Sequence, residues 1–178
     1  MNSLCSTVDL ASFTIETRTP YINLVGAGGG GSGGLCGSSF LNRIFDTYLR
    51  TKLQGYPRWT DRLHQMALKE FETRKQTFAG TKPFKVHVEG HHSNDPRHGI
   101  NDSLLEISAA ELKTEIFKPV IDKIKTLVRS QIDKTVNDGT PVKAVLLAGG
   151  FGKNPYLLAQ LKEMVAGDGI VVTVVENR

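Results

Sequence analysis

Residues 142–175 constrain the fold of this chain more than any other stretch. Residues 144–148 form an uninterrupted apolar run, which is typical of a strand buried on both faces of a mainly parallel sheet. A second apolar run, residues 170–175, follows after a segment with helical spacing. The order strand, helix, strand predicts a βαβ unit and places the chain in the α/β class.

The helix of this unit has its own start and stop signals. Asn154 is a favoured N-cap residue, and Pro155 suits the first helical position, where a missing N–H costs nothing. Gly167 and Gly169 predict the end of the helix. The apolar residues that recur at helical spacing are Leu157, Leu158, Leu161, Met164 and Val165. These signals predict one amphipathic helix between the two strands.

The turn between the first strand and this helix has the sequence Gly149-Gly-Phe-Gly-Lys153. Ligands of open α/β sheets bind outside the carboxyl ends of the strands, and this turn occupies that place. Gly149 and Gly150 would let a ligand approach the backbone closely. The same glycines also fit a plain turn without a ligand, so the residues of the turn leave both interpretations open.

The first third of the chain predicts a hairpin, a loop and a helix. Residues 7–16 and 21–25 read as two strands that start the sheet, with the bend near Thr19-Pro20. Residues 26–37 are a glycine-rich loop, which we interpret as native although residues 28–32 match a common flexible linker. A helix capped by Ser38 or Ser39 follows. One face of this helix carries Leu41, Ile44, Phe45, Tyr48, Leu49 and Leu53.

The middle of the chain predicts two further helices and two short strands. A helix over about residues 59–78 carries its charged residues off the apolar stripe, so its polar face is expected to be free for a ligand. Strands are expected at residues 84–88 and 104–107, with a polar loop at 91–100. Ser108 and Glu111 form a capping box that opens the longest helix. Pro119 is expected to break or kink that helix.

Composition excludes several classes of protein. With 178 residues, 39% of them hydrophobic, the chain can bury the core of one domain. Its net charge of +4 comes without a basic cluster, so we expect no nucleic-acid partner. No apolar run reaches the length of a membrane span and no export signal is recognisable, so we expect a cytoplasmic protein with reduced cysteines.

Three further motifs are compatible with functional sites, but their sequence context favours other roles. Residues 26–31 satisfy the dinucleotide pattern G-x-G-x-x-G, but the following helix starts too late to receive a pyrophosphate. Four histidines and Asp95 fall within residues 87–98, yet adjacent His91 and His92 seldom converge on one ion, so no metal site is expected. Cys36 lies near a helix N-terminus that would stabilise a thiolate, but no base is found for it and we expect a structural role.

The glycine turn resembles the adenosine motif of the actin-like ATPase superfamily, in its heat-shock-seventy (DnaK-like) branch and its divergent, fungal-type members. Four upstream blocks resemble the same family in the same order: residues 7–10, 33–42, 71–78 and 111–119. The resemblance implies an actin-like (ribonuclease-H-like) α/β lobe with a mixed central sheet flanked by helices. Residues 1–37 and 108–178 would form its sheet core, and residues 38–107 an inserted smaller subdomain of helices and strands.

The resemblance assigns adenosine contacts to particular residues. Glu72 and Lys75 stand where the family holds the ribose with an acid and a lysine. Gln76 and Lys153 replace two arginines that would stack on adenine, so the resemblance implies weaker adenine recognition, or recognition through Phe151. Gly149 and Gly150 would line the same pocket. ATP or ADP is therefore the expected cofactor, bound weakly or no longer bound.

The phosphate-binding half of the family's site is largely missing. Thr7 and Asp9 match the tail of the second phosphate motif, where Asp9 would face a magnesium-bound water, so magnesium would enter only with the nucleotide. Leu4, Cys5 and Ser6 replace the glycines that would cradle phosphate. The family's first lobe would precede Met1, and its second connecting helix would follow Arg178. We therefore expect the second lobe alone.

Two functions follow from this resemblance. The first is an adenine-nucleotide-binding lobe of a chaperone-like ATPase that does not catalyse hydrolysis alone, because the positioning and charge clamps of phosphoryl transfer are absent. The second is a non-catalytic protein-interaction module on the same scaffold that has lost ATP. The surface left by the missing lobe would then bind a protein partner or a second copy.

Overall fold

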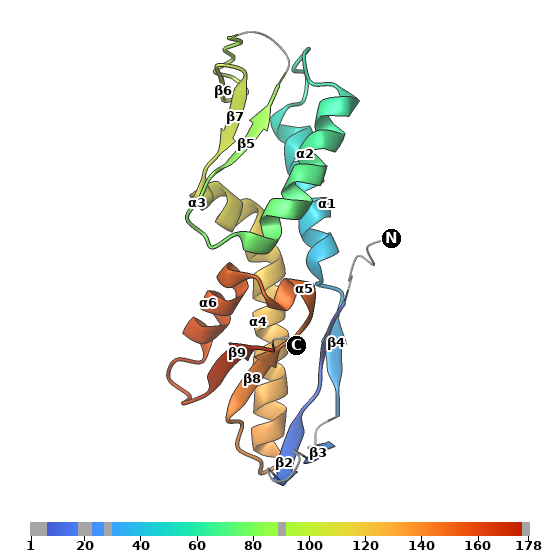
Figure 1. Ribbon diagram of the computed structural model, residues 1–178, viewed down its shortest axis with the longest axis vertical. Helices are drawn as coiled ribbons and strands as arrows, with labels where there is room; N and C mark the ends of the chain where they lie inside the picture. The colour runs from blue at the N-terminus through green and yellow to red at the C-terminus, as the bar shows by residue number, and fades with distance from the viewer. Residues whose placement is uncertain (1–6, 18–22, 27–29, 89–91, 176–178) are drawn as a thin grey trace.

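A long helical segment joins the two ends of the molecule in the computed structural model, which describes residues 7–17, 23–26, 30–88 and 92–175 (Figure 1). This segment consists of α3 (Ala109–Glu111), η2 (Leu112–Phe117) and α4 (Lys118–Asn137). The upper part of Figure 1 holds α1, α2 and strands β5 to β7. In the lower part, β4 (Ser32–Gly34) lies on one side of α4 and α6 (Pro155–Met164) on the other, and α5 (Gly149–Gly152) is drawn between α4 and β4.

The described strands form four separate sheets. Three are antiparallel: β1 (Val8–Leu10) with β4 (Ser32–Gly34), β2 (Phe13–Thr17) with β3 (Asn23–Gly26), and β7 (Leu104–Ile107) between β5 (Phe84–His87) and β6 (Ile100–Asn101). The fourth pairs β8 (Ala144–Leu147) with β9 (Val171–Val174) in parallel. The predicted α/β class is confirmed. The predicted hairpin is confirmed in part: β2 pairs with β3, but the strand expected over residues 7–16 is divided into β1 and β2, and β1 pairs with β4. The expected single mixed central sheet is not formed by the described strands. The predicted bend at Thr19-Pro20 lies outside the described residues.

The predicted βαβ unit is present at the end of the chain. Strand β8 leads through the short helix α5 (Gly149–Gly152) into α6 (Pro155–Met164), which returns to β9. Asn154 caps α6, since its Oδ1 accepts a hydrogen bond from the backbone N–H of Leu157 at 2.7 Å. Both the cap and the position of Pro155 agree with the prediction.

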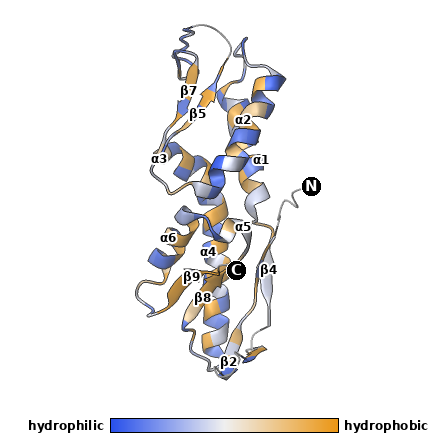
Figure 2. Cartoon of the chain, viewed as in Figure 1, coloured by the Kyte–Doolittle hydropathy of each residue, from blue (hydrophilic) through white to orange (hydrophobic). Residues whose placement is uncertain are grey.

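The prediction that the first strand of this unit is buried on both faces is wrong. On the face turned to the helices, Val172 is only 4% exposed. On the other face Leu146 is 64% exposed and Val171 is 61% exposed. Figure 2 shows β8 and β9 mostly in the orange of hydrophobic residues. Since Leu146 and Val171 remain this exposed, none of the described strands and helices covers this second apolar face, although parallel sheets are normally covered on both faces.

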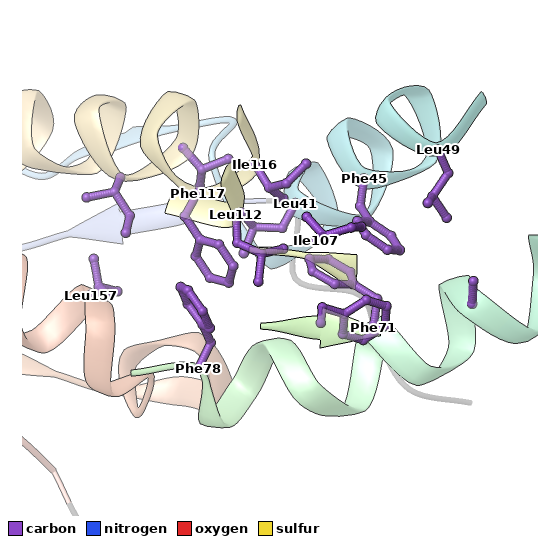
Figure 3. Close-up of a cluster of buried hydrophobic side chains, with 14 of the residues drawn as sticks. Leu41, Phe45, Leu49, Phe71, Phe78, Ile107, Leu112, Ile116, Phe117 and Leu157 are labelled. Atoms are coloured by element: carbon purple, nitrogen blue, oxygen red, sulfur yellow. The ribbon is translucent and has the colours of Figure 1, made fainter. Parts of the chain in front are cut away.

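Aromatic rings fill the core where α1 (Ser38–Lys52) and α2 (Asp61–Arg74) pack on β5. The rings of Phe45 and Phe71 are stacked with centroids 4.0 Å apart, and Phe84 meets Phe45 edge to face at 5.3 Å. Phe78 stacks in turn on Phe117 of η2 at 4.4 Å (Figure 3). The two amphipathic helices predicted for this region are therefore confirmed, with α2 continued by the short helix η1 (Lys75–Thr77). The predicted cap of α1 by Ser38 or Ser39 is wrong, because Gly37 is the N-cap residue and both serines lie inside the helix.

The longest helix begins at the predicted capping box and adapts to its proline. The Oγ of Ser108 accepts a hydrogen bond from the N–H of Glu111 at 3.1 Å. Pro119 neither ends nor sharply breaks the helix, because the turn before it widens into the π-helix η2. Proline has no N–H for the carbonyl four residues earlier, and a wider turn changes which N–H that carbonyl can reach.

The glycine-rich segment is fastened to α4 by polar side chains. Ser32 donates a hydrogen bond to Gln131 Oε1 at 2.7 Å, and Gln131 Nε2 donates to the carbonyl of Gly30 at 3.0 Å. Gln131 is only 6% exposed, so its amide is committed to these partners. Part of the predicted loop is moreover a strand, since β4 pairs with β1. These contacts support the interpretation of the segment as native.

Candidate functional site

Lys75 is buried inside the predicted adenosine site, with only 2% of the residue exposed. Its Nζ donates hydrogen bonds to the carbonyl of Ser38 at 3.1 Å, to Oδ1 of Asn42 at 2.8 Å and to Oε2 of Glu72 at 2.8 Å. These three acceptors use all three protons of the ammonium group. The expectation that Lys75 lies on a ligand-accessible helix face is therefore wrong, because the N-terminus of α1 covers it.

Two opposing effects act on the pKa of Lys75. Burial lowers the pKa of the Lys75 ammonium, since a charged group loses its hydration there, and the hydrogen bond and charge of Glu72 raise it in part. The ion pair therefore offsets part of the cost of burying the ammonium. Lys75 thus links α1 to α2 through buried hydrogen bonds and is not accessible to solvent.

Glu72 remains open to solvent in this network. Its side chain is 35% exposed, and its Oε2 accepts hydrogen bonds from Lys75 and from the side-chain amide of Asn42. Asn42 therefore bridges the two charged residues, with its oxygen toward Lys75 and its nitrogen toward Glu72. This arrangement fixes the orientation of the Glu72 carboxylate and leaves acceptor capacity on it for a hydroxyl donor.

Asn154 connects this network to the glycine turn. The residue is fully buried, and its Nδ2 donates to the carbonyl of Lys75 at 2.7 Å and to that of Phe78 at 3.4 Å. The backbone N–H of Tyr156 also donates to the carbonyl of Phe78, at 3.2 Å. The start of α6 is thus held against η1, which immediately follows the turn of α2 that carries Glu72.

The glycine turn itself presents an open surface. Gly149 adopts a φ of +82°, a conformation that favours glycine, and both Gly149 and Gly150 are exposed. No atom lies within 4 Å of the position that a Cβ would occupy on either residue. Phe151 is half-buried and Lys153 is exposed beside them. The backbone of the turn is therefore accessible to a flat ligand.

The N-terminal residues assigned to phosphate lie on a different element. Thr7 Oγ1 donates a hydrogen bond to Asp9 Oδ2 at 3.3 Å, and Asp9 on β1 is paired with Gly33 on β4. Asp9 is exposed, and Gly33 leaves room for its carboxylate, because a Cβ there would stand 2.7 Å from Asp9 Oδ1. Among the described residues, Asp9 forms no hydrogen bond or ion pair with the glycine turn. Leu4, Cys5 and Ser6 lie outside the described residues.

Other predicted candidates have structural surroundings. Burial raises the pKa of the Cys36 thiol, and the nearby Lys123 offsets only part of that effect, so the helix N-terminus does not make Cys36 a thiolate. His98 Nδ1 lies 2.8 Å from Asp95 Oδ2, and His92 Nδ1 lies 2.5 Å from Asp102 Oδ1. No group of three metal-ligating side chains occurs in the described part of the chain, which omits His91.

Sequence reasoning missed Asn42 and the second role of Asn154. Asn42 stands in a helix without any local feature that marks it, because its role depends on the distant Lys75. Asn154 was recognised as a cap, but a cap uses only its oxygen, and a buried asparagine also needs acceptors for its amide protons. That requirement was the one signal that could have indicated a long-range partner.

Comparison of the sequence with protein-family models and with curated proteins finds no match. Among the described residues, no helix combines the length and the apolar character that crossing a membrane requires. The functional assignment therefore rests on the geometry of the candidate site. In that geometry Glu72, Lys75, Gly149, Gly150 and Lys153 belong to two segments joined through Asn154. Asp9 lies on β1, the strand that begins directly after Thr7, and belongs to neither of these segments.

Proposed function

We propose that this chain binds the adenosine part of an adenine nucleotide between Glu72 and the glycine turn. The observation that carries this proposal is the hydrogen bond from Asn154 to the carbonyl of Lys75 at 2.7 Å. It fastens together the two segments to which the resemblance to actin-like ATPases assigns adenosine contacts, although they are far apart in the sequence. The bond is buried, so the relative position of the two segments is well defined.

Glu72 would recognise the ribose. A carboxylate accepts hydrogen bonds and its two oxygens can receive the two neighbouring hydroxyls of a ribose ring. Lys75 and Asn42 hold the Glu72 carboxylate in place, so Lys75 is a positioning residue and not a direct contact. This assignment changes the expectation from the resemblance, in which both residues hold the ribose.

Gly149 and Gly150 would receive the adenine base. Their exposed backbone has open space where side chains would otherwise project, so a planar ring can approach it. Lys153 and Gln76 are exposed near this turn and supply polar contacts instead of stacking guanidinium groups. We therefore propose weak binding in which the sugar and the base supply most of the binding free energy.

The phosphates would contribute little to binding, and magnesium would enter only with the nucleotide. Asp9 lies on β1 and forms no hydrogen bond or ion pair with the glycine turn in the described part of the chain. Each charge-assisted hydrogen bond to phosphate that is lost removes about 1.5 to 3 kcal/mol, which moves a tight site toward millimolar affinity. ATP hydrolysis by this chain alone is not part of the proposal, because Leu4, Cys5 and Ser6 replace the glycines that would cradle phosphate in the resembled family.

Calorimetric titration with adenosine, ADP and ATP, each with and without magnesium, tests this function. We expect the three ligands to bind with similar, weak affinity and with little effect of magnesium. Asp9→Ala is the matched variant, because it removes the only candidate phosphate-side carboxylate and should leave all three affinities unchanged. ATP binding at least tenfold tighter than adenosine in the presence of magnesium would contradict the proposal, and so would the absence of binding by all three.

A second function is favoured by the apolar surface of the molecule. Leu146 and Val171 lie exposed on the open face of the β8–β9 sheet. Phe13, Ile15 and Leu24 are 50–60% exposed on the β2–β3 hairpin, where Ile15 stands directly opposite Leu24. Parallel sheets normally have both faces covered, and apolar surface of this kind marks protein contacts. The alternative function is therefore a non-catalytic module that binds a protein or a second copy of itself.

A further inference from the structure

A pocket lies beside the candidate adenosine site, on the side of α2 that faces β5 and η2. Its volume is about 420 Å³, within the range of about 300 to 1,000 Å³ that is usual for small-molecule sites. Of the residues assigned to adenosine, the buried Lys75 borders this pocket, whereas Glu72, Gly149, Gly150 and Lys153 do not. Neither the sequence motifs nor the proposed nucleotide function accounts for this cavity.

The floor of the pocket is aromatic. Phe71, Phe84 and Phe117 are each at most 3% exposed, and together with Phe78 and Leu112 they form its inner wall. Figure 3 shows Phe78 and Phe117 directed toward each other, with Leu112 beside them. A surface of this kind favours a planar ring, since aromatic pairs gain both apolar burial and favourable ring geometry.

The rim of the pocket is cationic. It carries Arg74 and Lys82, and the residues that line the pocket include no aspartate or glutamate. Arg74 is already paired with Glu70 at 2.8 Å and lies over the ring of Phe84 at 5.6 Å. Lys82 is exposed and forms no ion pair with any other described residue. One positive charge at the rim is therefore uncompensated.

We propose that this pocket binds a small aromatic carboxylate. The ring would lie on the aromatic floor, and the carboxylate would face Lys82, with the hydroxyl of Thr81 also at the rim. A single uncompensated cation matches a monoanion better than a phosphate group, which usually meets several donors or a cradle of backbone N–H groups. The two sites share only the buried Lys75, whose ammonium is already bonded to Ser38, Asn42 and Glu72, so Lys82 can be tested without altering the adenosine contacts.

Titration of the full chain with 2-naphthoate, followed by ligand-detected NMR, tests the assignment. Its neutral analogue, 2-naphthalenemethanol, has the same ring without the charge. We expect the acid to bind more tightly than the alcohol, and Lys82→Gln to weaken the acid about fivefold, the upper end for an exposed charge pair, without affecting the alcohol. Lys85→Gln is the matched control, since Lys85 is an exposed lysine of the same segment that is paired with Glu106 outside the pocket.

Four outcomes would overturn the proposal. Equal binding of acid and alcohol would show that no charge is recognised, and an equal loss in Lys85→Gln would show only a general effect of surface charge. Displacement of 2-naphthoate by adenosine would place the ligand in the nucleotide site. No binding up to the solubility limit of the acid would show that the pocket is not a ligand site. Because Lys82 is exposed, its substitution should leave the fold intact, which thermal unfolding would verify.

Discussion

The side-chain amide of Asn154 donates a hydrogen bond to the backbone carbonyl of Lys75 at 2.7 Å, across 79 residues of sequence. The same side chain caps α6 through its oxygen. One buried residue therefore sets both where the last helix begins and where that helix meets η1. The position of the glycine turn relative to Glu72 depends on this residue.

Asn154→Ala should destabilise the protein by about 2 to 4 kcal/mol. The substitution removes a helix cap, leaves the N–H of Leu157 without its acceptor, and leaves the carbonyl of Lys75 with only the longer hydrogen bond from the N–H of Phe78 at 3.5 Å. Ser108→Ala is the matched control, because Ser108 only caps a helix, and its loss should cost about 1 kcal/mol. Urea unfolding of both variants measures the difference. Equal losses would mean that the long-range bond adds nothing to stability.

The ion pair between His98 and Asp95 should make stability depend on pH. Its hydrogen bond to Asp95 raises the pKa of His98, and the same hydrogen bond lowers the pKa of Asp95. The contribution from His98 is complete below its usual pKa of about 6.5 and is lost as the pH rises through the raised value. The contribution from Asp95 is present above about pH 3.9 and is lost as the pH falls through the lowered value.

His98→Gln should therefore lower the melting temperature most between about pH 4 and pH 6.5, and less at pH 8. The measurement is thermal unfolding of wild type and variant across this range. Asp95→Asn provides the control background, in which the pH dependence of the His98→Gln effect should disappear. A pH dependence that persists in that background would assign it to some other partner of His98.

Cys36 should react slowly with alkylating reagents in the folded protein. The residue is 2% exposed, and burial raises the pKa of its thiol, so both access and the thiolate fraction are reduced. Peptide mass spectrometry after iodoacetamide treatment at pH 7.5 should show alkylation of Cys36 at least tenfold slower than in urea. Equal rates in the two conditions would indicate an accessible thiolate at the start of α1.

Local patterns predicted the elements better than their environment. The βαβ unit, the caps at Ser108 and Asn154 and the two amphipathic helices depend on residues close in sequence, and the structure confirms them. The prediction that β8 is buried on both faces was wrong. An apolar run shows which residues a strand could bury, but burial also requires a covering element, and none of the described elements covers Leu146.

In the candidate site, too, local motifs indicated the residues but not their environment. Glu72 and the glycine turn could be proposed from motifs, but the burial of Lys75 follows from Ser38 and Asn42 on a different helix. Charged side chains are rarely fully buried, so a lysine on a polar helix face is reasonably expected to meet solvent. Only the packing of α1 against α2 shows that this lysine has three internal acceptors.

The exposed face of the β8–β9 sheet should promote self-association. Leu146 and Val171 are more than 60% exposed there, and covering them would remove apolar surface from water. Sedimentation velocity should show concentration-dependent association of the wild-type chain that is weaker in Leu146→Lys. Met66→Lys is the matched control, since Met66 is a similarly exposed residue on α2, away from this sheet. A monomer at all concentrations would remove the support for the interaction-module alternative.

The recognition of ribose by Glu72 is the centre of the proposed function. Calorimetric titration of adenosine and of 2′,3′-dideoxyadenosine into wild type and Glu72→Gln tests it most directly. We expect the wild type to prefer adenosine about tenfold, since hydrogen bonds to a charged acceptor are worth about 1.5 to 3 kcal/mol, and the variant to lose most of that preference. Glu70→Gln, on the same helix, should retain it. Equal affinity of the wild type for both nucleosides, or an unchanged preference in Glu72→Gln, would contradict the account.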